Sequence, residues 1–113
     1  MKKSKAAPRY SWDYYGLKDK GYRKKLKQMA QSDKYVTFLR SAAHTASEMI
    51  AEYLLLSVTK GLSYDTLRVK WELREIEQMP CGRTNFYGIR RYFYYLFDKK
   101  LKESGKYSYS ELA

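Results

Sequence analysis

Apolar residues recur at helical spacing through the middle of the chain, and this feature most restricts the fold. Over residues 35–56 they follow one another at steps of four, three, four, three, four and three residues: Tyr35, Leu39, Ala42, Ala46, Met49, Tyr53 and Leu56. Such a repeat forms one apolar stripe along a helix. Ser32 and Asp33 can cap its start and Gly61 is a stop signal. The sequence therefore predicts one long central helix over residues 33–60.

Further apolar residues widen this stripe. Val36, Ala43 and Ile50 lie on one side of it. A wide stripe is typical of a helix in a globular core, whereas the seam of a two-stranded coiled coil is narrower. We therefore expect a core helix, and dimerisation through part of its surface remains an alternative.

Three other helices are expected from helix formers and breakers. Residues 22–30 consist mostly of good helix formers. A cap candidate precedes residues 64–79 and a proline follows them, which favours a helix there. Residues 67–73 alternate apolar and charged, so a short strand stays open at that point. A last helix is predicted over residues 83–103.

These elements predict an all-α fold, a small helical domain with a long central helix and a C-terminal helix-turn-helix-like pair. At 113 residues the chain can bury one core. Residues 1–31 are expected to form a flexible, basic, aromatic N-terminal arm, in which rings between residues 12 and 22 pack on the domain as a strap. The helical domain then covers residues 32–104, and residues 105–113 have the composition of a flexible tail.

Positive charge is concentrated at both ends of the chain. The sequence has 23 Lys and Arg against 12 Asp and Glu, a net charge of +11. Residues 1–31 carry a net +8, residues 32–80 a net −1 and residues 81–113 a net +4. An excess of this kind attracts polyanions, with nucleic acid first and an anionic membrane surface second. The segregation favours a polyanion partner over a general solubilising role.

The last predicted helix has two separate faces. One is an apolar stripe for the core, made by Phe86, Ile89, Phe93, Leu96 and Phe97. The other carries arginine and tyrosine, namely Arg83, Tyr87, Arg90 and Tyr94, with Arg91 beside them. Guanidinium groups suit guanine edges and phosphates, and tyrosine hydroxyls suit phosphate oxygens. The second face is therefore a candidate surface for DNA.

The order of elements around Pro80 matches a helix-turn-helix. A helix ending at Met79, a break at residues 80–82 and a helix with a polar, basic start follow one another, and in this motif the second helix enters the major groove by its N-terminal residues. The predicted DNA-binding residues of that helix are Arg83, Thr84, Asn85, Tyr87, Arg90, Arg91 and Tyr94. Backbone contacts are expected from Arg91, Lys99 and the arm residues Arg23, Lys24, Lys25 and Lys27.

Two segments, GLSYDTL and MPCGRTNFYGIRRYFYYLFDKKL, resemble the C-terminal part of small regulatory proteins that phages and mobile elements of Gram-positive bacteria encode, related to sigma-factor region 4. In those families a pattern Pro-x-(Ser/Gly)-Arg-(Thr/Ser)-x-(Phe/Tyr)-Tyr opens the recognition helix. Here Pro80, Gly82, Arg83, Thr84, Phe86 and Tyr87 match it, and Arg90 and Arg91 follow as the usual basic pair. The resemblance covers about the last 45 residues, and residues 64–79 are longer than the usual first helix of the motif. It implies a DNA-binding regulator.

Catalytic and metal-binding constellations are not visible in the sequence. His44 is the only histidine and lies beside alanines, which fits a packing or surface role. Cys81 is the only cysteine and fits a half-buried turn residue, with a reactive thiolate near Arg83 as the alternative. No Gly-rich phosphate loop occurs. We therefore expect no enzyme, no metal and no cofactor.

Two further features bear on where the protein acts. The longest apolar run is too short to cross a bilayer, and the start of the chain lacks a hydrophobic signal core. We therefore expect a cytoplasmic protein without a membrane partner, and the single cysteine fits a reducing compartment.

The function predicted is sequence-selective binding of double-stranded DNA, as a transcriptional regulator of phage or mobile-element type. Two alternatives stay open. One is a phage-type inhibitor or adaptor that binds a host nucleic-acid enzyme, because the 13 tyrosines suit a protein interface. The other is binding of RNA or single strands through Tyr87, Tyr94, Tyr107 and Tyr109 stacking on bases.

Overall fold

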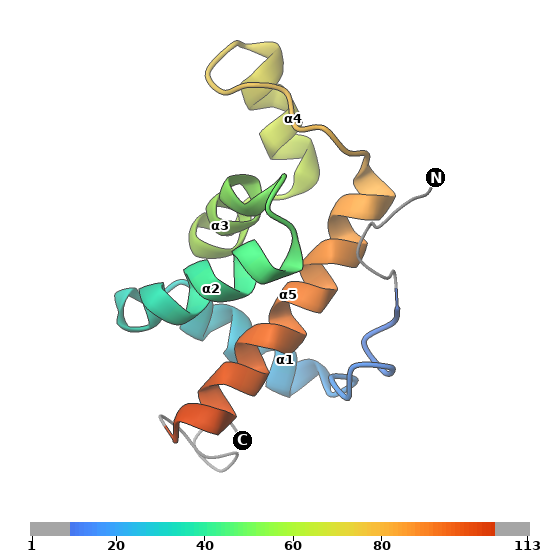
Figure 1. Ribbon diagram of the computed structural model, residues 1–113. Coiled ribbons are helices and arrows are strands. Elements are labelled where there is room, and N and C mark those ends of the chain that lie inside the picture. The colour runs from blue at the N-terminus through green and yellow to red at the C-terminus, as the bar shows by residue number, and fades with distance from the viewer. Residues whose placement is uncertain (1–9, 106–113) are drawn as a thin grey trace.

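The computed structural model describes residues 10–105, and these form five α-helices and one short 3₁₀ helix, with no strand among them (Figure 1). The helices are α1 (Lys20–Ala30), α2 (Val36–Ala46), α3 (Ala51–Lys60), α4 (Tyr64–Glu72) and α5 (Arg83–Ser104), and the 3₁₀ helix η1 (Asp33–Tyr35) directly precedes α2. The predicted all-α class is confirmed. In the described part of the chain, none of the helices combines the length and the apolarity that crossing a membrane requires.

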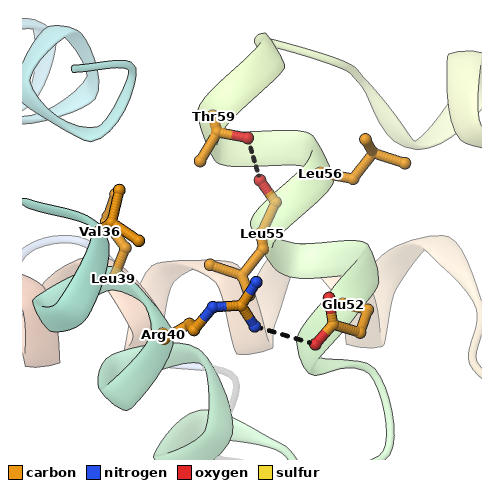
Figure 2. A pocket seen from close by; sticks show the side chains of 7 residues that line it. All are labelled: Val36, Leu39, Arg40, Glu52, Leu55, Leu56 and Thr59. Atoms are coloured by element: carbon orange, nitrogen blue, oxygen red, sulfur yellow. Dashed lines mark hydrogen bonds and ion pairs between the residues drawn. The ribbon is translucent and has the colours of Figure 1, made fainter. Parts of the chain in front are cut away.

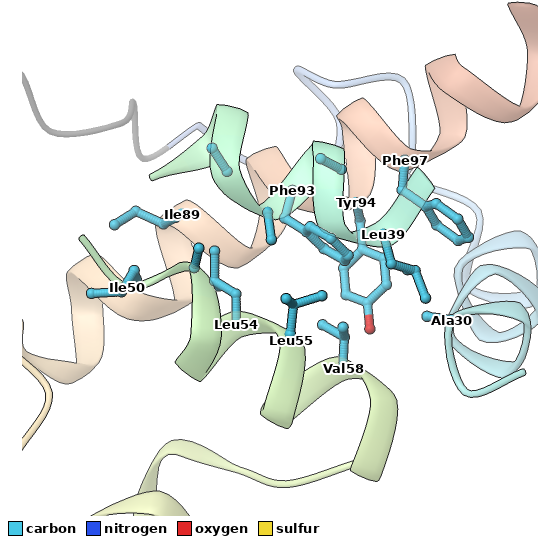
Figure 3. Close-up of a cluster of buried hydrophobic side chains, with 14 of the residues drawn as sticks. Ala30, Leu39, Ile50, Leu54, Leu55, Val58, Ile89, Phe93, Tyr94 and Phe97 are labelled. Atoms are coloured by element: carbon cyan, nitrogen blue, oxygen red, sulfur yellow. The ribbon is translucent and has the colours of Figure 1, made fainter. Parts of the chain in front are cut away.

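Helix α5 is the long helix around which the others are arranged (Figure 1). Gly82 lies at its N-cap, and Gly105 closes it in the left-handed conformation with φ 72°. Its buried apolar side chains are Phe86, Ile89, Phe93, Tyr94, Phe97 and Leu101, several of which pack in the core with α2 and α3 (Figure 3). The helix predicted over residues 83–103 is therefore confirmed.

Residues 33–60 do not form the single helix that the apolar spacing predicted. Helix α2 ends at Ala46, Ser47 is extended with φ −169° and ψ 114°, and α3 begins at Ala51. The chain reverses there, so that α3 packs back along α2 (Figure 1). A straight helix over these residues would be about 40 Å long and would extend past α5. The reversal lets both halves bury apolar residues in one core.

The reversal also shifts the apolar register by one residue. Met49, which the spacing placed in the core, is 71% exposed, whereas Ile50 is 1% exposed. After the break the buried apolar residues are Ala51, Leu54, Leu55 and Val58. Tyr53 and Leu56, predicted to be in the stripe, are half-buried at its edge.

Helix α4 is shorter than predicted, because a capping motif ends it at Glu72. Arg74 is left-handed with φ 64°. Its N–H donates to the carbonyl of Trp71, and the N–H of Glu75 donates to the carbonyl of Lys70. This pair of bonds is a Schellman motif, which commonly closes helices.

The connection between α4 and α5 is accordingly longer than a helix-turn-helix break. It runs over residues 73–82 in place of the residues 80–82 expected, and Met79 is buried within it. The alternative of a strand over residues 67–73 is wrong, because these residues belong to α4 as far as Glu72.

Residues 10–31 are packed on the domain, so the boundary predicted at residue 32 does not separate an arm from a core. Leu17 and Leu26 are fully buried. The helix expected at residues 22–30 is present as α1, which begins at Lys20, where the carboxylate of Asp19 accepts the N–H groups of the first turn. Residues 1–9 of the predicted arm and 106–113 of the predicted tail lie outside the described residues.

A polar contact joins α1 to α5. The hydroxyl of Tyr22 donates a hydrogen bond to the carboxylate of Asp98, which is buried. Lys102, one turn further along α5, forms an ion pair with the same carboxylate at 3.1 Å. The start of α1 is therefore fixed beside the C-terminal half of α5.

Candidate nucleic-acid interface

Positive charge is concentrated on one side of the fold, here called the basic side. Residues 10–105 carry 18 Lys and Arg against 11 Asp and Glu. On or just before α1 lie Lys18, Lys20, Arg23, Lys24, Lys25 and Lys27, and on the second part of α5 lie Arg90, Arg91, Lys99, Lys100 and Lys102. These two segments lie together, away from α4 (Figure 1).

Acidic residues of α3, α4 and the connection that follows α4 are mostly in ion pairs. Five of the 11 lie on α3, on α4 or in residues 73–82: Glu52, Asp65, Glu72, Glu75 and Glu77. Ion pairs join Arg40 to Glu52 at 3.3 Å, Arg68 to Glu72 at 3.2 Å and Lys70 to Glu75 at 3.5 Å. The uncompensated charge therefore belongs to the basic side.

The first turn of α5 presents three of the predicted base-contacting residues. Arg83 and Thr84 are exposed and Asn85 is half-buried. Nη2 of Arg83 lies 2.6 Å from Oδ1 of Asp65, and its guanidinium lies 5.3 Å from the ring centre of Tyr64. The hydrogen bond from Arg83 lowers the pKa of the Asp65 carboxyl below its ordinary value. Arg83 is thus held at the start of the helix by a surface contact.

Two of the predicted DNA-contacting tyrosines serve the fold. The hydroxyl of Tyr87 accepts the N–H of Tyr64 at 2.9 Å, which ties α4 to α5. Tyr94 is 2% exposed and lies among the core side chains in Figure 3. Its ring centre is 6.1 Å from that of Trp12, and burial raises the pKa of its hydroxyl. The prediction that Tyr94 faces a partner is wrong, because core residues and Trp12, which belongs to the segment of residues 10–19 before α1, cover this part of α5.

Two predicted basic residues of α1 lie over one indole ring, and a third, from α5, lies over the neighbouring tyrosine ring. Cζ of Arg23 lies 4.9 Å and Nζ of Lys27 lies 5.7 Å from the ring centre of Trp12. Cζ of Arg90 lies 5.5 Å from the ring centre of Tyr94, the neighbour of Trp12. We call Arg23, Lys27, Arg90 and Trp12 the cationic niche.

The remaining predicted basic residues differ in their surroundings. Lys24, Lys25 and Lys99 are exposed. Nε of Arg91 donates to the carbonyl of Tyr10 at 2.7 Å, so this side chain holds the strap (residues 10–19) against α5. Lys24, Lys25 and Lys99 are therefore the ones best placed to meet a partner's phosphates.

A hollow lined by tyrosines lies between the strap and α5, and sequence reasoning missed it. Its volume is about 510 Å³, and it is lined by Tyr10, Tyr14, Tyr15, Tyr92 and Tyr95. The rings of Tyr10 and Tyr14 stack with their centres 3.9 Å apart. The aromatic runs YSWDYY and YFYY are the signal in the sequence, but a helical projection cannot place a strap that is not helical. We call this site the tyrosine hollow.

A second hollow, of about 380 Å³, lies between α2 and α3 (Figure 2). Val36, Leu39, Leu55 and Leu56 make much of its lining. Arg40, which also lines it, is paired with Glu52 across the two helices. A mostly apolar hollow whose charges are paired does not attract a polyanion.

The residues considered for catalysis or metal binding have structural surroundings. Within residues 10–105, no group of three or more His, Cys, Asp or Glu is placed to hold a metal ion. Nδ1 of His44 lies 2.8 Å from Oε1 of Glu48, and its Nε2 lies 3.7 Å from Oε2 of Glu52. Burial raises the pKa of the Cys81 thiol, which contradicts the alternative of a reactive thiolate.

Comparison with known proteins gives no relative. No protein-family model matches the chain, and no curated protein or solved structure matches it significantly. The function is therefore inferred from the residues of the chain itself.

Proposed function

We propose that this protein binds double-stranded DNA through two regions of one extended surface, the basic side, which holds phosphates, and the first turn of α5 beside α4, which reads sequence. The observation that carries the proposal is the separation of uncompensated positive charge on α1 and α5 from the paired charge on α3 and α4. A duplex presents a regular array of phosphates, and a protein that neutralises them with Lys and Arg gains affinity by releasing counterions. An extended basic surface fits such a partner.

The proposed contacts with DNA are of two kinds, to phosphates and to base edges. Lys24 and Lys25, exposed on α1, would contact phosphates and hold the protein on the duplex. Arg83, Thr84 and Asn85 would reach base edges, because they form the start of α5 and a guanidinium matches the acceptors of guanine. Arg83 would exchange Asp65 for a base, which costs little because an exposed ion pair contributes little to stability.

Transcriptional regulation of phage or mobile-element type is the finer form of the proposal. It is supported by the start of α5 at Arg83, because the Pro80–Tyr87 pattern shared with such regulators opens a recognition helix at the matching position. Because the connection over residues 73–82 is long, α4 does not take the position of the first helix of a helix-turn-helix motif. In the proposed complex α1 takes over the backbone contacts.

Salt-dependent binding tests the proposal. Affinity for labelled duplexes, measured by fluorescence anisotropy between about 50 and 200 mM salt, is expected to fall linearly on a log–log plot. The double variant Lys24→Ala, Lys25→Ala should weaken binding to every sequence alike and reduce the slope by about 2, since each phosphate contact contributes about 0.9. Arg40→Ala, which removes an exposed arginine of α2 that is paired with Glu52, is the matched control and should change neither.

Selection of duplexes from a random pool tests the reading of sequence. The wild-type chain is expected to enrich a motif, and Arg83→Ala to flatten that preference while Lys24→Ala leaves it in place. No binding at the lowest salt, or an equal effect of Arg40→Ala and the double lysine variant, would contradict duplex binding.

A second candidate, binding of single strands, is favoured by the tyrosine hollow. Tyr10 and Tyr14 are 44% and 65% exposed, and bases stack on aromatic rings with little regard to sequence. Competition between duplex and single strands of equal length distinguishes the two candidates. Tyr14→Ala should weaken single-strand binding alone if the hollow holds a base.

A further inference from the structure

We propose that the cationic niche binds one phosphate group, which Arg23 and Lys27 of α1 and Arg90 of α5 hold together beside Trp12. In the complex that we propose, this group is a phosphate of the DNA backbone. The identity of that phosphate rests on the proposed function, whereas the presence of a phosphate site does not. The experiment below uses small phosphates first, so that the two can fail separately.

The niche is assembled from three segments. Arg23 and Lys27 lie one turn apart on α1, and both lie over the ring of Trp12, at 4.9 Å and 5.7 Å. Trp12 belongs to the strap and approaches Tyr94 of α5. Arg90 lies between the rings of Tyr87 and Tyr94, with Cζ 5.7 Å and 5.5 Å from their centres. The aromatic rings therefore fix where the cations converge.

The three cations lack a counter-charge among the described residues. None of the ion pairs within residues 10–105 includes Arg23, Lys27 or Arg90. The nearest acidic residue before α1, Asp19, is engaged in capping the helix. Like charges that converge without an anion repel one another, and an anion bound between them would remove that repulsion.

Arg90 also has one nitrogen atom that lacks a hydrogen-bond partner within residues 10–105. Its Nε is buried and has no hydrogen-bond partner in the described part of the chain. Leaving a buried donor unpaired is unfavourable, and such atoms usually have a partner. A small outward movement of the guanidinium would bring this atom within reach of a phosphate oxygen, which would satisfy it.

The chemistry of the three groups selects phosphate. Nη1 of Arg23 donates to the carbonyls of Leu17 and Lys18 at 2.8 Å and 2.9 Å, so its guanidinium is held in place and Nε and Nη2 are left for a ligand. Two guanidinium groups donate in the planar, forked geometry that phosphate accepts, and lysine adds a point charge. Burial and the neighbouring arginines lower the pKa of Lys27, which indicates that the site is partly shielded from water.

Fluorescence of Trp12 gives a direct test. In a Trp71→Phe background Trp12 is the only tryptophan, and titration with phosphate or pyrophosphate at constant ionic strength is expected to give a saturable change. Lys27→Met, and independently Arg90→Met, should weaken this binding about tenfold or more, since each removes a charge-assisted contact but keeps the packing of the stem. Lys24→Met, an exposed lysine on the same helix, is the matched control and should bind as the wild type does.

Thermal unfolding supplies a second readout that a purely structural role would not give. Without phosphate, Lys27→Met is expected to raise the melting temperature, because it removes repulsion from Arg23 and Arg90. With phosphate, the wild type should gain stability and Lys27→Met should not. If Arg90→Met fails to fold, the fluorescence titration and the thermal unfolding of Lys27→Met still test whether the niche binds phosphate.

Three results would overturn the proposal. They are a response to phosphate no larger than that to chloride at equal ionic strength, an equal response to acetate or to a Glu-rich peptide, and an equal loss of binding in Lys24→Met and Lys27→Met. A duplex arm then tests the ligand's source. If the protein binds phosphate but no duplex, the niche is a site for small phosphate compounds and the DNA proposal is wrong. If Lys27→Met leaves duplex binding unchanged, the niche does not contact DNA.

Discussion

Arg74 closes α4 in a left-handed conformation, φ 64°, that helices more often assign to glycine. A side chain in this conformation costs about 1–2 kcal/mol from the clash of Cβ with the following carbonyl. Arg74→Gly is therefore expected to raise the free energy of unfolding by about 1 kcal/mol, part of the gain being lost to the greater freedom of glycine in the unfolded chain. Urea unfolding followed by circular dichroism measures the change.

Gly61 provides the opposite control. It ends α3 with φ 69°, and a Cβ at this position would lie 3.2 Å from Nε2 of Gln31. Gly61→Ala should lower the free energy of unfolding by about 1–2 kcal/mol. If Arg74→Gly destabilised the protein as well, the left-handed closure of α4 would be wrong.

Lys27 gives a prediction in pH. Its pKa in the folded chain is lowered by burial and by the charges of Arg90 and Arg23, so the protonated lysine disfavours the folded state at neutral pH. Between the lowered pKa and the ordinary value the unfolded chain binds the extra proton, and stability rises with pH. The stability advantage of Lys27→Met over the wild type, measured by thermal unfolding, should therefore be largest at neutral pH and shrink as pH approaches about 10.5. An advantage independent of pH, or one equal to that of Lys24→Met, would contradict this.

At the scale of elements, α1 and α5 could be predicted and the elements between them only in part. The starts and ends of α1 and α5 coincide with changes in composition that the sequence shows, such as Gly82 before Arg83. The reversal between α2 and α3 has no such marker. Residues 47–50 contain neither glycine nor proline, and the apolar spacing continues through them, although Ser47 is extended. The helix breaks here because both halves bury their apolar residues in one core. A local sequence pattern does not show which distant residues will share that core.

The same limit applies to the candidate site. The helical projection of α5 correctly separated Phe86, Phe93 and Phe97 from Arg83 and Arg90. It could not show that Tyr94 is covered, because the covering residues come from the distant strap. Single basic residues were identified, but their convergence at the cationic niche is a property of the tertiary structure.

The strap yields a prediction at this scale. Leu17 is 1% exposed, so Leu17→Ala is expected to lower the free energy of unfolding by about 2–4 kcal/mol through lost burial and a cavity. Tyr14→Ala removes a side chain that is exposed on the same segment but stacks on Tyr10, and we expect it to lower the free energy of unfolding by about 1 kcal/mol or less. Chemical unfolding compares the two. Equal small effects would mean that residues 10–19 are not an integral part of the domain.

The dimensions of the whole molecule set the size of the DNA site that we propose. The molecule measures 42 × 32 × 23 Å. At about 3.4 Å per base pair, its longest dimension covers about 12 base pairs. Affinity should therefore increase with duplex length up to about 12 base pairs, and rise only slowly, through the number of overlapping positions, beyond it. Anisotropy titrations with a series of duplexes check this, and full affinity for a duplex of about six base pairs would contradict the use of the long side.

The place of α5 along the chain also matters for the time at which the fold forms. The side chains from Phe86 to Leu101 complete the core, and they follow α1, α2, α3 and α4 in sequence. During synthesis on the ribosome the earlier helices therefore emerge with their apolar sides uncovered, because the helix that they share has not yet been made. A domain with its central helix last in sequence cannot fold stepwise from the N-terminus, and we infer that it folds only once nearly all of the described chain has left the ribosome.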